Sequence, residues 1–320
     1  MRKDDCHNVE RQFRYVNSDD WCRGRGTRMF APHGIVPALV TPLTRDGDLM
    51  EDSLRTLIDY VIDGGVHGVF VLGSSGEIYG LDQAQKRRIL EITTEQVNGR
   101  VAVYAGASEI TTRDCVRTAQ LAAEIGGVDA LSVLTPYFMT PTQAELIGHY
   151  KAIAAATDLP VVLYNNPGRT NVPITVDTAV ELASVENIVG IKDSSGDFTL
   201  STDYIRETPD DFAVLLGRDT LIYAGLCHGA AGAIASTGNI VPELIVGIYD
   251  AFKAGDAAKA LELQGELTPL RNLVDVATFP VVLKEALRIA GIDAGYCLAP
   301  ANDLNERYRA ELATVVHNLI

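Results

Sequence analysis

The sequence lacks paired cysteine motifs and closely spaced histidines. Its five cysteines include no CxxC pair, and an odd number cannot be fully paired within one chain. This argues against a disulfide framework or a zinc ribbon and favours a reducing compartment, so we expect a cytoplasmic protein. The six histidines show no HxxxH or HExxH spacing. We therefore predict no metal site.

Long apolar runs and an excess of basic residues are also missing. No stretch approaches the roughly 18 apolar residues that a membrane span requires, and 42 acidic against 27 basic residues give a net charge of −15. This charge repels nucleic acid and anionic membranes. The pattern GxxxxGKS/T is absent, and no GxGxxG follows the first predicted strand. We expect no nucleic-acid or membrane partner, no nucleotide binding and no cofactor.

Residues 1–30 are polar, carry charges of both signs and lack the apolar core of a secretory signal. We expect them to form a disordered tail. From residue 31 the chain alternates short apolar runs with longer amphipathic segments. The apolar runs predict eight strands: Ile35–Val40, Gly68–Leu72, Val101–Ala105, Ala130–Leu134, Val161–Tyr164, Ile188–Ile191, Ala213–Leu216 and Gly232–Ala235.

Helices are predicted between these strands, and only helices after Asn239. Strand then helix, repeated eight times, is typical of a (β/α)₈ TIM barrel; a doubly wound sheet is the alternative. The fold class is therefore α/β, a (β/α)₈ TIM barrel with a C-terminal helical extension. We divide it into a barrel of residues 31–240 and a C-terminal helical domain of residues 241–320.

One lysine stands at the end of the sixth predicted strand. The apolar run from Ile188 to Ile191 leads into Lys192, and parallel barrels place their chemistry at the carboxyl ends of strands. Desolvation of an ammonium lowers its pKa and makes the amine able to attack a carbonyl. The structural alternative is a lysine that extends to solvent or pairs with Asp193.

Two other strand ends carry reactive or binding groups. After the second strand, the loop from Gly73 to Glu77 offers glycines and the hydroxyls of Ser74 and Ser75, which can hold a carboxylate, or it is an ordinary tight turn. After the fifth strand come Tyr164, which can transfer protons, and Arg169, which can bind a carboxylate. A capping tyrosine and a surface arginine are the structural alternatives.

These three strand ends open on the same face of a barrel. A carboxylate-binding loop, a phenol and a desolvated amine together indicate a 2-oxo acid, held by its carboxylate while its carbonyl condenses with lysine.

Four motifs in order resemble the superfamily of dihydrodipicolinate synthase and N-acetylneuraminate lyase, the pyruvate-dependent class I aldolases. They are GSSGE from Gly73, YNNPGRT from Tyr164, GIKDSSG from Gly190 and GAAGAIASTGN from Gly229. The resemblance covers residue 34 to the C-terminus. It implies a (β/α)₈ barrel with a C-terminal helical domain, commonly a tetramer.

The resemblance also implies roles for single residues. Lys192 would form the Schiff base and Tyr164 would relay protons. Ser74 and Ser75 would bind the 2-oxo carboxylate, and Ile234 would line the pyruvate pocket.

The substrate remains open between two kinds of family member. Arg169 resembles the synthases, in which this arginine binds the carboxylate of aspartate semialdehyde. Phe138, however, stands where the synthases have a second tyrosine that reaches across a dimer into the proton relay. Sugar-acid lyases place hydroxyl-binding groups at the positions of Ser194, Asp219 and Ser236.

We therefore expect a lyase acting on a 2-keto-3-deoxy sugar acid or an N-acetylneuraminate-type substrate, with pyruvate as product or donor. The alternatives are 4-hydroxy-tetrahydrodipicolinate synthase, which condenses pyruvate with aspartate semialdehyde, and a non-catalytic pyruvate-binding protein. A homo-oligomer, dimer or tetramer, is expected from the resemblance.

Overall fold

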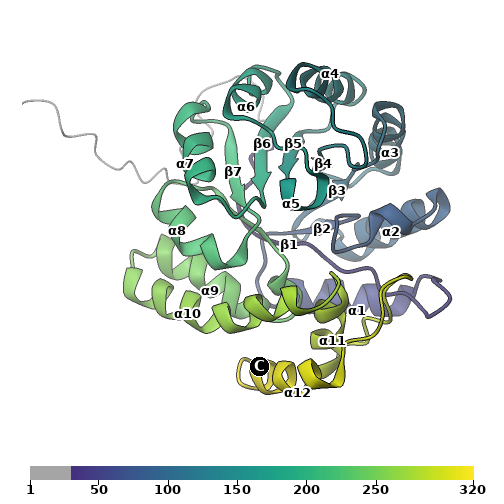
Figure 1. The fold of residues 1–320 in the computed structure, drawn as a ribbon, viewed down its shortest axis with the longest axis vertical. Helices are drawn as coiled ribbons and strands as arrows, with labels where there is room; N and C mark the ends of the chain where they lie inside the picture. The colour runs from purple at the N-terminus through teal and green to yellow at the C-terminus, as the bar shows by residue number, and fades with distance from the viewer. Residues whose placement is uncertain (1–29) are drawn as a thin grey trace, which may run out of the picture.

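The computed structural model describes residues 30–320, so the expected tail lies outside the described residues except for Phe30. Eight strands alternate with helices in this range (Figure 1). The strands are β1 (Gly34–Pro37), β2 (Gly68–Val71), β3 (Ala102–Gly106), β4 (Ala130–Leu134), β5 (Val161–Asn165), β6 (Ile188–Asp193), β7 (Ala213–Leu216) and β8 (Gly232–Ala235).

Helices follow the strands in the order that the sequence predicts. They are α1 (Glu51–Asp63), α2 (Gln83–Val97), α3 (Thr112–Ile125), α4 (Gln143–Ala154), the short α5 (Pro167–Thr170), α6 (Val176–Leu182), α7 (Phe198–Glu207) and α8 (Ile222–Cys227). Several begin at side chains that accept backbone N–H groups; α2 and α4 both have capping boxes, built by Asp82 with Gln85 and by Thr142 with Glu145.

The strands form one parallel sheet in the order β1-β8-β7-β6-β5-β4-β3-β2. The two end strands approach each other, because Ala38 makes a parallel bridge to Phe70 and the Leu39 N–H donates to the Phe70 carbonyl at 2.8 Å. The sheet therefore closes into a TIM barrel, as predicted, and the carboxyl ends of all eight strands face one opening.

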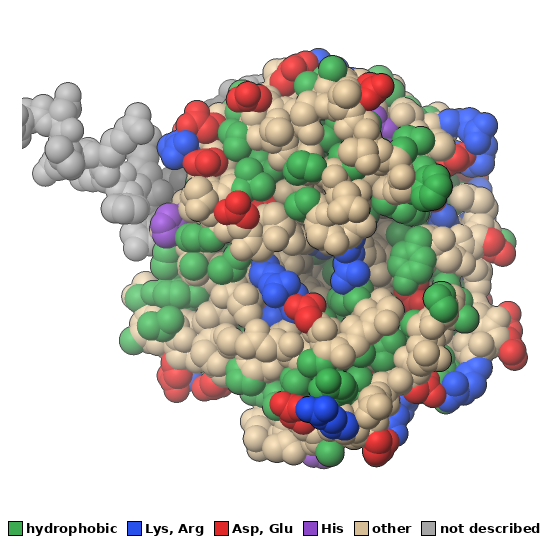
Figure 2. Space-filling model, viewed as in Figure 1, with side chains coloured by type: hydrophobic (Ala, Val, Ile, Leu, Met, Phe, Trp, Pro, Cys, Tyr) green, Lys and Arg blue, Asp and Glu red, His purple; other side chains and the backbone are tan. Residues whose placement is uncertain are grey.

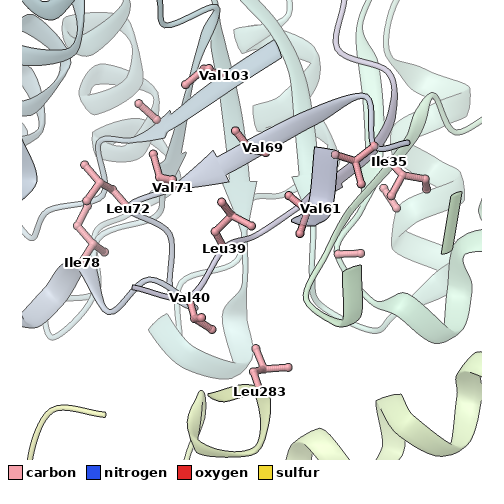
Figure 3. Packing of buried hydrophobic residues seen from close by; sticks show 14 of the residues in the cluster. Ile35, Leu39, Val40, Val61, Val69, Val71, Leu72, Ile78, Val103 and Leu283 are labelled. Carbon is pink, nitrogen blue, oxygen red and sulfur yellow. The ribbon is translucent and has the colours of Figure 1, made fainter. Parts of the chain in front are cut away.

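Two apolar clusters hold the barrel together. Inward-facing residues such as Val36, Phe70 and Leu215 fill its interior. A larger cluster lies between the strands and the helices, where Figure 3 shows Ile35, Val69 and their neighbours. This second cluster includes Leu283 from a helix beyond the barrel (Figure 3). The helices after β8 therefore share the core of the barrel.

The C-terminal helices are α9 (Pro242–Lys253), α10 (Ala257–Leu273), α11 (Val281–Ile289) and α12 (Glu306–His317), with the 3₁₀ turn η5 (Val274–Val276) after α10. In Figure 1, α10 to α12 run along one side of the barrel. Proline disfavours a helix interior, yet α10 continues through Pro269 for one more turn. That turn contains Arg271.

None of the helices formed by residues 30–320 combines the length and the apolar character needed to cross a bilayer.

Candidate active site

Lys192 lies inside β6, and its side chain is only 4% exposed. Its ammonium lies 4.1 Å from the ring centre of Tyr164 and 5.0 Å from that of Phe70. The lysine therefore does not extend to solvent. The electron-rich faces of these two rings attract the ammonium.

Asp193, the next residue, does not pair with Lys192, because its carboxylate is occupied elsewhere. It accepts hydrogen bonds from the Asn165 amide at 2.9 Å, the Ser195 hydroxyl at 3.0 Å and the Ser201 hydroxyl at 2.6 Å. Successive strand side chains point to opposite faces. Asp193 thus fixes the end of β6 from outside while Lys192 points into the barrel.

Tyr164 lies beside Lys192 because β5 and β6 pair in a register that aligns the two residues. Its phenol oxygen accepts a hydrogen bond from the Asn166 amide at 3.1 Å. Burial raises the pKa of this phenol, but the nearby charge of Lys192 and hydrogen bonds with Asn166, Ser74 and Ser194 outweigh it, so the pKa falls to about 8. A phenol with this pKa can both give and take a proton near neutral pH.

The loop after β2 presents Ser74 and Ser75 to the same opening. Leu72 and Glu77, on either side of it, both adopt positive φ angles, 57° and 55°. The Thr41 hydroxyl donates to the Gly76 carbonyl at 2.7 Å. The loop is therefore a tightly held turn with two hydroxyls at its tip.

A single cavity joins these groups, and its volume is about 520 Å³ with the open mouth included. Figure 2 shows the hollow near the centre of this face, with basic side chains at its edge. Of the predicted site residues, all but one line it: Ser74, Ser75, Tyr164, Arg169, Lys192, Ser194, Ile234 and Ser236.

Asp219 is the predicted site residue that the structure keeps away from the cavity. It is buried, and its carboxylate accepts hydrogen bonds from the Thr237 hydroxyl at 2.6 Å and the Ser236 hydroxyl at 3.2 Å. Its other oxygen lies 3.4 Å from the Ser236 N–H, and Asp219 is not among the residues that line the cavity. Asp219 instead orients Ser236, which does line the cavity.

Five further lining residues have polar or aromatic side chains that the sequence analysis gave no role: Asn166, Arg218, Arg271, Asp275 and Phe279. Asn166 belongs to the motif that begins at Tyr164, and Arg218 directly precedes Asp219. Their nearness to predicted site residues could have indicated that they line the cavity. Arg271, Asp275 and Phe279 come from the C-terminal segment, and nothing local in the sequence shows that it reaches the opening.

Phe138 does not line the cavity of the single chain. It has a φ angle of 73° and a side chain that is 97% exposed. An aromatic ring held outward by a constrained backbone is suited to contact another molecule.

The closed parallel barrel and the buried lysine beside a phenol define an α/β-barrel enzyme of the class I aldolase type. The chain belongs to the dihydrodipicolinate synthetase family, whose model matches residues 31–319.

Several known proteins are similar to it. The 4-hydroxy-tetrahydrodipicolinate synthase of Methanopyrus kandleri is 38% identical, over 87% of this chain and 93% of that protein. The solved dihydrodipicolinate synthase of Bacillus anthracis superimposes with a TM-score of 0.88 at 35% identity, covering 91% of this chain and all of that one. A prophage protein of the family from E. coli K12, solved with pyruvate, gives a TM-score of 0.87 at 33% identity, covering 90% and 98%.

Proposed function

We propose that the chain is a pyruvate-dependent lyase in which Lys192 forms a Schiff base with a 2-oxo acid. The observation that carries this proposal is the buried Lys192 ammonium 4.1 Å from the Tyr164 ring, inside the cavity. A solved family member that holds pyruvate supports it. Ser74 and Ser75 bind the carboxylate, and Ile234 packs against the three-carbon fragment.

The chemistry follows from these positions. The Lys192 amine adds to the C2 carbonyl, and loss of water gives an iminium ion. A base removes the proton of the C4 hydroxyl, the C3–C4 bond breaks, and its electron pair moves into the iminium to give an enamine and an aldehyde. Tyr164 transfers these protons and then protonates C3 of the enamine. Hydrolysis releases pyruvate and regenerates the amine, so the iminium is the electron sink and no cofactor is required.

For the substrate, we propose a 2-keto-3-deoxy sugar acid or an N-acetylneuraminate-type acid. Phe138 supports this choice, because a phenyl ring cannot pass a proton where the resemblance places a relay tyrosine. Ser194 and Ser236 line the cavity and can bind hydroxyls of a sugar chain.

A second candidate is 4-hydroxy-tetrahydrodipicolinate synthase. The Methanopyrus kandleri relative carries that name. Arg169, which lines the cavity, can bind the carboxylate of aspartate semialdehyde.

Borohydride trapping tests the reaction type. Reduction in the presence of pyruvate should add a stable three-carbon adduct to the peptide containing Lys192, and Lys192→Arg should abolish it. Lys253→Arg, a change near the end of α9, is the matched control. A missing adduct in the parent protein excludes the Schiff base, whereas an adduct without turnover of any substrate indicates a pyruvate-binding protein.

A side-by-side assay tests the substrate. Pyruvate release from 2-keto-3-deoxygluconate or N-acetylneuraminate is compared with condensation of pyruvate and aspartate semialdehyde. Cleavage at the higher kcat/KM supports the sugar-acid lyase. If only the condensation proceeds, the synthase is correct.

We also propose a homo-oligomer in the cytoplasm. The exposed side chains of Phe138, Met139 and Tyr79 support an interface. One solved relative is described as a monomeric variant, so assembly has to be measured. A solution mass of one 34.4 kDa chain at micromolar concentration would contradict this proposal.

A further inference from the structure

The cavity lining is more positively charged than the chain as a whole. Four basic side chains, Arg169, Lys192, Arg218 and Arg271, line it with a single acidic one, Asp275, although the sequence carries a net charge of −15. Low-dielectric walls concentrate such a field and attract anions. The proposed Schiff-base chemistry uses Lys192 and gives no role to Arg218 and Arg271.

Arg271 is the most deeply placed of these arginines. It lies in the last turn of α10 and is buried. Its Nη1 lies 3.0 Å from an Asp275 oxygen, whereas its Nε is buried without a hydrogen-bond partner among the described residues. Burying an arginine with unused donors is unfavourable. Its position is therefore better explained by a ligand than by the fold.

Arg218 reaches the same carboxylate from another part of the chain. It follows β7, and its Nη2 lies 3.2 Å from the same Asp275 oxygen. One carboxylate thus holds two guanidinium groups together and neutralises only one of their charges. Arg169 stacks on Phe279 at 4.3 Å, so it too lies against the C-terminal segment.

We propose that Arg218 and Arg271, the distal arginine pair, bind a second anionic group at the end of the substrate away from the 2-oxo carboxylate. The inference rests on the proposed function and narrows it to 2-oxo acids with an acidic group at both ends. Carboxylate and phosphate oxygens both fit guanidinium N–H donors. Asp275 holds the pair in place while the ligand is absent and competes with it for donors.

The alternative is that the arginine pair only links the β7 loop to α10 and η5. That role predicts a loss of stability in each variant and no change in ligand selectivity. The proposal predicts changes in selectivity of opposite sign for the arginines and for Asp275.

Calorimetric binding of three unreactive sugar acids separates the two roles. Gluconate, glucarate and 6-phosphogluconate share a six-carbon chain and end in a hydroxyl, a carboxylate and a phosphate. We expect at least one of the two doubly acidic ligands to bind about tenfold or more tightly than gluconate. The ligand with the larger gain in affinity shows whether the arginine pair prefers a carboxylate or a phosphate. Arg271→Gln and Arg218→Gln should abolish the gain, and Asp275→Asn should increase it.

The controls keep the outcome clear. Arg206→Gln, on the exposed face of α7 and paired with Glu207, should leave all three dissociation constants unchanged. Arg218 is partly exposed, so its variant serves if Arg271→Gln does not fold. Equal binding of the three ligands, no binding, or a preference that survives both arginine changes would overturn the proposal. Trapping of pyruvate on Lys192, measured separately, tests the proposed function itself.

Discussion

The Glu77 carboxylate lies 2.6 Å from the Lys284 ammonium, and both side chains are buried. Glu77 ends the loop that carries Ser74 and Ser75, whereas Lys284 belongs to α11. The same carboxylate accepts the Leu298 N–H at 2.8 Å. The C-terminal helices therefore fix the loop that we expect to bind the 2-oxo carboxylate.

Lys284→Met leaves the Glu77 charge buried without its partner. We expect a loss of about 3–5 kcal/mol in the free energy of unfolding, because an uncompensated buried charge is costly. Urea denaturation measures it. Lys259→Met, which breaks the exposed pair with Glu262, should cost no more than about 1 kcal/mol. Equal losses of unfolding free energy in the two variants would show that the buried pair stabilises the protein no more than the exposed pair does.

The pKa of Tyr164, lowered to about 8, predicts a phenolate that appears near pH 8 in an ultraviolet absorbance titration. Tyr164→Phe should remove this step. Removing the Lys192 cation takes away the charge that favours the phenolate, while burial still raises the pKa. In Lys192→Met we therefore expect the step to move to higher pH. A midpoint that stays near pH 8 in this variant would mean that the lysine charge is not the cause.

Gly106 lies at the end of β3, where an added Cβ would come within 1.8 Å of the Leu72 carbonyl oxygen. Because this atom belongs to the backbone, Gly106→Ala has to displace the segment leading into Ser74. We expect a loss of about 1–3 kcal/mol in stability and a higher KM for pyruvate. Gly148→Ala in α4 meets nothing within 4 Å and should stabilise by up to about 1 kcal/mol. Thermal unfolding and steady-state kinetics measure both.

Phe138→Tyr restores the hydroxyl that a synthase relay would use. We expect the condensation of pyruvate with aspartate semialdehyde to become faster, by up to about 10²-fold for one proton-transfer group, with little change in cleavage of sugar acids. Tyr137→Phe is the companion variant. If it abolishes a condensation already present in the parent protein, Tyr137 supplies the missing phenol and the substrate proposal fails.

The strands and the central site residues could be predicted from sequence because their signals are local. Short apolar runs located all eight strands, and each of the four motifs includes or follows the end of a strand. The end of the sixth strand was placed one residue before Lys192, whereas β6 continues to Asp193. The pairing of Lys192 with Tyr164 extends the strand, and that interaction is not local.

The far wall of the cavity could not be predicted, for two physical reasons. Proline disfavours a helix interior, so the sequence gives no local signal that α10 continues past Pro269 to Arg271. The direction of Asp219 depends on the Thr237 hydroxyl, 18 residues away. Sequence spacing does not show which of two faces a side chain in such a loop will occupy.

The cavity takes its reactive groups from strand ends and its far wall from the segment between Arg271 and Phe279. Under the proposed function, the groups that react with pyruvate lie at strand ends, whereas the distal end of the substrate also meets this C-terminal segment. A chimaera that exchanges residues 271–279 with those of a relative should accept a different aldehyde portion while its reaction with pyruvate is preserved. Under the proposed function, such an exchange changes the substrate range and leaves Lys192 in place.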